Sequence, residues 1–93
     1  MDLSSRLEAL LTAAESIGIE IRAEPMDGSS GGLCRLKNRL VLFVDTTSDL
    51  ATRYDDALSA LAPLTELDEH FLAPALREDL EQRRAELQKS AGS

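Results

Sequence analysis

The chain has 93 residues, enough for one domain and too few for two. Its hydrophobic fraction of 43% is ordinary for a globular protein, and with one Tyr, two Phe and no Trp the core must be built from aliphatic side chains. The formal net charge of −7 disfavours binding to nucleic-acid phosphates or anionic lipid, which attract basic surfaces. We therefore expect no nucleic-acid partner and no membrane partner, whereas a protein partner is compatible with this charge.

Cys34 is the single cysteine, so the chain cannot form a disulfide within itself. Its first residues lack the basic start and apolar run of a secretory signal. The longest apolar run, residues 40–44, is far too short to cross a bilayer. These features predict a cytoplasmic protein.

A helix is predicted over residues 3–17, where apolar side chains recur at the spacing that places them on one stripe. It could begin at Asp2, or at a capping box formed by Ser5 and Glu8. Gly18 follows the last apolar residue of the stripe, where a helix needs a left-handed exit.

Three strands are expected next. Residues 19–24 alternate between apolar and charged side chains and stop at Pro25. Residues 33–37 and 40–45 predict two further strands, joined by a tight turn around Asn38, a residue type that tolerates positive φ. Short connections favour an antiparallel meander of the three strands in sequence order.

The strand at residues 40–45 is apolar on both faces, with Val41 and Phe43 on one of them. Such a strand is usually covered on both sides, by helices of its own chain or by another subunit. It is the indication in this sequence that the protein forms a homodimer.

A second helix is predicted between residues 45–48, which supply several N-cap side chains, and Pro63. Its expected buried stripe consists of Leu50, Tyr54, Ala57, Leu58 and Leu61. Residues 64–72 are ambiguous, and one helical turn around Leu67 and Phe71 is one interpretation.

Pro74 is well placed to open a last helix. We expect Leu76, Leu80 and Leu87 to face inward there, with Arg84 at the edge of the row. The prediction is thus a single α+β domain at residues 1–89, with a disordered tail at 90–93. It consists of a helix, a three-stranded antiparallel meander, and two helices packed on one face of the sheet.

Arg35, Lys37 and Arg39 form the basic cluster of the chain, and alternation is expected to place Arg35 and Lys37 on one strand face with Arg39 beside them. They could bind an anion or RNA, but no aromatic residue alternates with them to stack bases. A solvated sheet face whose charges protect an edge from aggregation is the favoured interpretation. Together with Val41 and Phe43 they make up the predicted interaction surface.

Cys34 could be a redox-active thiol or form an intersubunit disulfide, but a free cysteine is most often a small apolar core residue, and we favour that interpretation. His70 is the only histidine. A zinc site needs about four ligands, mostly Cys and His, and this chain has one of each. The acids beside His70 could hold a cation weakly, but a solvated helical turn explains them equally well. No metal and no cofactor are expected.

The Gly-rich stretch at residues 28–32 lacks the Gly-Lys-Ser/Thr ending of a phosphate-binding loop and joins two strands, so a flexible connection is favoured. The acid pairs Asp55-Asp56 and Glu78-Asp79 could be imagined as acid–base catalysts. Adjacent helix positions point in different directions, however, so solvated helix faces are favoured for both pairs.

The expected order of helix, three strands and helix over residues 1 to about 62 resembles that of class I type III secretion chaperones, in element order only, and departs from it after Pro63. The sequence favours a small acidic, non-enzymatic protein-interaction module, adaptor-like or chaperone-like and homodimeric. The alternative is a small enzyme or ligand-binding subunit whose site forms between chains, around Cys34 and the hairpin of Arg35, Lys37 and Arg39. A nucleic-acid regulator that uses the basic hairpin is a third, less favoured hypothesis.

Overall fold

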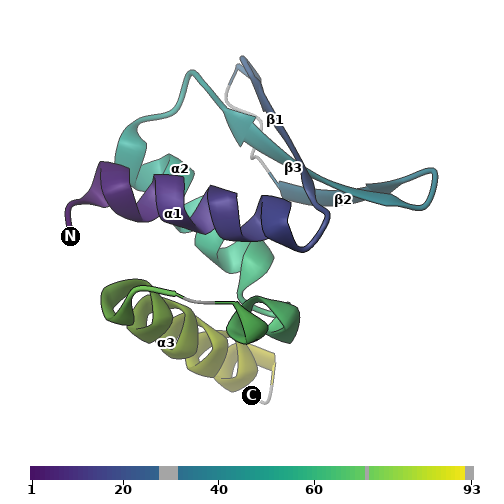
Figure 1. Cartoon of the computed structure of the whole chain (residues 1–93). Coiled ribbons are helices and arrows are strands. Elements are labelled where there is room, and N and C mark those ends of the chain that lie inside the picture. Colours follow the sequence, from purple (N-terminus) through teal and green to yellow (C-terminus); the bar gives the residue numbers. More distant parts are fainter. Residues whose placement is uncertain (28–31, 71, 92–93) are drawn as a thin grey trace.

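A computed structural model of the chain describes residues 1–27, 32–70 and 72–91. It is α+β, as predicted (Figure 1). The elements are α1 (Leu3–Ser16), β1 (Glu20–Glu24), β2 (Gly32–Leu36), β3 (Arg39–Asp45), α2 (Leu50–Leu61), the 3-10 helix η1 (Thr65–Glu69) and α3 (Pro74–Ala91). The predicted Gly-rich connection lies outside the described residues except for Gly32, and so does Phe71.

Helices α1 and α2 each begin at an aspartate side chain. Asp2 caps α1 by accepting a hydrogen bond of 2.7 Å from the Ser5 backbone N–H, so the predicted Ser5–Glu8 capping box is not used. Gly18, with φ +92°, provides the expected left-handed exit. Asp49 caps α2 by accepting a bond of 2.7 Å from the Thr52 N–H. The cap expected within residues 45–48 was therefore placed too early.

The sheet is mixed and its strand order is β1-β3-β2, so the predicted antiparallel meander is wrong. β2 and β3 form the expected antiparallel hairpin, whereas β1 pairs with β3 in parallel. The seven residues that separate β1 from β2 are enough to carry the chain past β3. The two outer strands lie about 10 Å apart, and seven extended residues span roughly 23 Å.

A two-residue turn closes the hairpin, since Leu36 pairs with Arg39. Lys37 and Asn38 both have positive φ, 48° and 67°, as a type I′ turn requires. Asn38 was expected to adopt such a conformation. Lys37 was expected both to end the strand and to begin the connection, and it lies in the turn.

The molecule has three layers, visible in Figure 1: the sheet, then α1 and α2, then α3 with η1. α1 packs on β1 and α2 on β2 and β3, whereas α3 packs on α1 and α2. The prediction that the last two helices both lie on the sheet is therefore wrong for α3. The best-buried side chains come from all three layers: Leu10, Val41, Leu42, Leu61, Leu67, Leu76 and Leu80.

Side-chain contacts of arginines and acids join the helical layers. The Tyr54 hydroxyl donates to Asp79 Oδ2 at 2.6 Å, and Arg6 Nη1 lies 3.0 Å from the same oxygen, so α1, α2 and α3 meet at one carboxylate. Arg84 donates to the Ala62 carbonyl, close to the end of α2, and to Asp68 of η1. Asp79 was predicted to lie on a solvated helix face, and its partly buried contacts correct that prediction.

Leu87 does not complete the buried row of α3, because it is 37% exposed. Leu76 and Leu80, the other two residues predicted to face inward, are fully buried. α3 continues to Ala91, past residue 89, at which the sequence suggested that the ordered domain ends.

Candidate interaction surface

Strand register divides the sheet into two faces. Residues paired across neighbouring strands share a face, so the helix-covered face carries Ile21, Leu42 and Leu33 in one row. We call the other side the open face. Its residues are Glu20, Arg22 and Glu24 of β1, Arg39, Val41, Phe43 and Asp45 of β3, and Gly32, Cys34 and Leu36 of β2.

The open face is apolar along its middle. Val41 is only 1% exposed although it is not part of the core cluster beneath the helices. Phe43 is half-buried, Cys34 is exposed, and Leu36 is 44% exposed. The helices that contact the sheet in the described part of the chain lie on its other face, so no described helix covers the second side of this strand, although Val41 is buried there.

Cys34 is exposed, so the favoured prediction of a packed core residue is wrong. Its side chain projects from the open face of β2, opposite the residue that the helices cover. Alternation along the strand placed Cys34 on the same face as Leu36, which is correct, but that face is the uncovered one.

Charges of opposite sign flank the apolar middle of the open face. Glu20, which pairs with Val41 across the strands, contacts Arg22 at 2.5 Å and Arg39 at 3.3 Å. The hydrogen bond from Arg22, followed by the attraction of both guanidinium groups, lowers the pKa of the Glu20 carboxyl. With Glu24 included, two acids and two bases flank the apolar middle, and the third acid of this face, Asp45, is buried.

The basic cluster is divided by the hairpin. Arg35 lies on the same side of the sheet as Leu40, Lys37 lies in the turn, and Arg39 lies on the open face. All three are exposed, but Arg35 and Arg39 point to opposite faces, so the predicted single basic face is wrong. Of the predicted interaction residues, only Arg39, Val41 and Phe43 share a surface.

The two outer strands of the sheet have edges of different character. β1 presents Glu20, Arg22 and Glu24, whereas the five residues of β2 contain one charge, Arg35. Charged and short edge strands resist pairing with another chain. The β2 edge, which has no pairing strand among the described residues, is therefore the less protected of the two.

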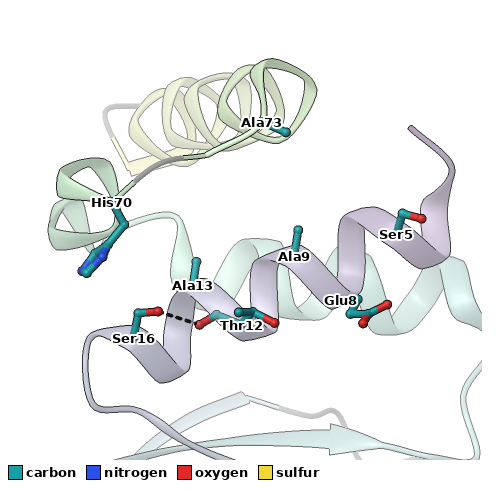
Figure 2. A pocket seen from close by; sticks show the side chains of 8 residues that line it. All are labelled: Ser5, Glu8, Ala9, Thr12, Ala13, Ser16, His70 and Ala73. Atoms are coloured by element: carbon teal, nitrogen blue, oxygen red, sulfur yellow. Dashed lines mark hydrogen bonds between the residues drawn. The ribbon is translucent and has the colours of Figure 1, made fainter.

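A second surface feature is the groove of about 590 Å³ between α1 and the segment that joins η1 to α3 (Figure 2). It is open to solvent and is lined by Ser5, Glu8, Ala9, Thr12, Ala13, Ser16, His70 and Ala73. Glu8 and His70 are the ionisable side chains of this groove, and the Ser16 hydroxyl at its edge donates to the Thr12 carbonyl at 3.0 Å. Within residues 1–27, 32–70 and 72–91, no three His, Cys, Asp or Glu side chains gather as a metal site would require.

Sequence reasoning missed that the carboxylate of Asp45 is buried and hydrogen bonded. It is 3% exposed and accepts hydrogen bonds from the Met26 N–H, the Thr47 N–H and hydroxyl, and the Ser48 hydroxyl, at 3.0, 2.9, 2.6 and 3.0 Å. These bonds, chiefly those from Thr47, hold its pKa well below the ordinary range. The donors lie in the segments that follow β1 and β3. Asp45 therefore has a structural role, because its carboxylate holds these two segments together at the end of β3.

Comparison with protein-family models, with curated proteins and with solved structures found no match. The resemblance in element order to class I type III secretion chaperones thus stays a prediction. No helix in the described part of the chain combines the length and the apolar character needed to cross a membrane.

Proposed function

We propose that this chain is a non-enzymatic protein-interaction module that acts as a homodimer, and that its contact surface lies on the sheet. The observation that carries the proposal is the apolar strip formed by Leu36, Cys34 and Phe43 on the side of the sheet that no described helix covers. Exposed apolar side chains gathered on one surface, with polar residues around them, are typical of contact sites between proteins.

Charge supports a second copy as the partner. Two chains of net charge −7 repel each other in general, so they can associate only where local charge is balanced. The solvent-accessible side chains of the open face meet this condition, because Glu20 and Glu24 are matched there by Arg22 and Arg39, while Asp45 is buried. The helical layers offer no comparable strip: Met1 and Leu87 are the exposed large apolar side chains outside the sheet in the described residues.

A pair of matched leucine variants tests the proposal. Leu36 is 44% exposed on the sheet and Leu87 is 37% exposed on α3, so serine at either position removes a similar apolar surface without opening the core. Sedimentation velocity over a range of protein concentrations, with reductant present, should show a concentration-dependent dimer for the wild-type chain. Leu36→Ser should raise its dissociation constant several-fold, while Leu87→Ser leaves it unchanged.

A wild-type chain that stays monomeric at every concentration would rule out the proposal. The reverse result, in which Leu87→Ser weakens the dimer and Leu36→Ser does not, would move the interface from the sheet to the helical layer. Circular dichroism of each variant shows that it is folded before its association is interpreted.

A further inference from the structure

We infer that two copies of this chain pair β2 with β2 in antiparallel fashion about a two-fold axis at Cys34, which forms one continuous six-stranded sheet. This inference rests on the proposed function and gives the dimer a defined edge and register. Its support comes from the hydrogen-bonding phase of the strand, from charge, and from the space above Gly32.

The phase of the β2–β3 hairpin determines which backbone groups face outward. A two-residue turn closes on a hydrogen-bonded pair, here Leu36 and Arg39, and the pairs alternate along the ladder from there. Cys34, two residues before Leu36, thus directs its N–H and C=O toward β3. Leu33 and Arg35 direct theirs to the outer edge, where another strand can pair with them.

Pairing centred on Cys34 matches this phase. Leu33 of one copy then lies opposite Arg35 of the other, so outward-facing groups meet outward-facing groups on both sides of the axis. The two Cys34 residues form the central pair that is not hydrogen bonded. In a register shifted by one residue, Leu33 of one copy would lie opposite Cys34 of the other. Outward-facing backbone groups would then lie opposite inward-facing ones, and the ladder could not form.

Charge selects among the registers that keep the phase. A shift that centres the pair on Arg35 would place the two guanidinium groups directly opposite each other, which destabilises an antiparallel pair. A shift that centres it on Leu33 would leave Leu36 without a partner within β2. The Cys34 register avoids the charge repulsion and uses all five residues of the strand.

Shape supports the same register. Gly32 lies beside Phe43 on the open face, and a Cβ built at Gly32 would meet no atom within 4 Å. In the Cys34-centred pair Leu36 of the second copy lies opposite Gly32. Its side chain, 44% exposed in the single chain, would therefore occupy the space above the glycine next to Phe43. The same contact repeats on the other side of the axis.

The pairing buries a short strand, so we expect a weak dimer that depends on concentration. Five residues a side provide less contact than the roughly 800 Å² per partner of stable complexes. Lysine at position 34 would place two ammonium groups opposite each other at the axis. Sedimentation velocity in reductant should show that Cys34→Lys weakens the dimer by at least about ten-fold, equivalent to 1.4 kcal/mol. Gln82→Lys, on the exposed surface of α3, adds the same charge elsewhere and should leave the dimer unchanged.

Diamide crosslinking tests the register. It oxidises two thiols to a disulfide and is itself reduced to the hydrazine, so the reaction reports which residue meets its own copy. Because the central pair brings the two Cβ atoms within disulfide range, Cys34 in the wild-type chain should crosslink about ten-fold faster than the cysteine of a Cys34→Ser, Arg35→Cys double variant. Faster crosslinking at position 35 would overturn the register.

The outcomes separate this inference from the proposed function. A dimer that resists Cys34→Lys, or that crosslinks faster at position 35, overturns the β2 pairing while the homodimer stands. A chain that is monomeric at every concentration overturns both.

Discussion

Asp45 illustrates at the residue scale how a buried charge can serve the fold instead of a reaction. It is the buried charged side chain among the residues that the structure describes, and hydrogen bonds from Met26, Thr47 and Ser48 compensate for its loss of water. Since Met26 follows β1 and Thr47 follows β3, this carboxylate fixes the parallel strand pair at its carboxyl end. Function is therefore better sought on exposed surfaces than at this residue.

Asp45→Asn should lower the stability of the protein at neutral pH, because the amide keeps the shape but loses the charge that strengthens four hydrogen bonds. The pKa of Asp45 is lower in the folded chain than in the unfolded chain, so its contribution is full above the unfolded value of about 3.9 and is lost as pH falls through the folded value. The gap between wild type and variant in urea midpoint should hence narrow from pH 7 to pH 3. The control is Asp27→Asn at an exposed position. A gap that is constant with pH would contradict this account.

Single positions also show what sequence reasoning could not reach. Alternation correctly placed Cys34 and Leu36 on one strand face, and the apolar character of Leu42 and Val44 correctly suggested burial. Whether a face is covered, however, depends on where the helices pack, and that is a property of the whole chain. Cys34 was assigned to the core because a free cysteine is most often a small apolar core residue, although such a residue fits either side of the sheet equally well.

The hairpin shows at the element scale that local chemistry predicts local structure. The turn was predicted because Asn38 tolerates positive φ, and it has the two-residue form that such a residue allows. Lys37 also has a φ of 48°, which a residue with a Cβ adopts at a cost. The turn that holds β2 against β3 thus contains a strained residue.

Lys37→Gly should raise the free energy of unfolding by about 0.5–1 kcal/mol, because glycine adopts positive φ without that cost and the gain exceeds its loss of chain entropy. Lys37→Ala is the matched control, since it removes the same charge and keeps the Cβ, and it should not stabilise the chain. Urea unfolding at equilibrium measures both. Equal stabilisation by the two variants would show that the Lys37 charge, and not its backbone conformation, is the unfavourable feature.

Strand order could have been predicted from a signal that was present in the sequence. The strand at Arg39–Asp45 is the most apolar of the three, and the centre of a sheet is its most buried position. Placing it between the two others gives β1-β3-β2, the observed order. The expectation that neighbouring strands in sequence pair with each other outweighed this signal, because it ignored the length of the connection between β1 and β2.

The arrangement of α3 matters at the scale of the whole molecule. α3 packs on α1 and α2, which in turn pack on the sheet, and its Leu76 and Leu80 are fully buried. Tyr54, Arg6 and Asp79 tie the same three helices through one carboxylate. The third layer is thus part of one continuous core, and loss of its packing should be felt at β3 on the other side of the molecule.

Leu80→Ala should lower the free energy of unfolding by about 3 kcal/mol, the usual cost of a cavity in a packed core, and Leu87→Ala on the same helix by about 0.5 kcal/mol or less. If the three layers unfold together, hydrogen exchange of the β3 amides should accelerate in Leu80→Ala by the factor that corresponds to its loss of global stability. In Leu87→Ala the β3 amides should exchange as in the wild type. If the β3 amides of Leu80→Ala exchange at the wild-type rate while its α3 amides exchange faster, α3 unfolds independently of the sheet. The sheet and its open face would then be a separate folding unit, on which the interaction surface could be studied without the third layer.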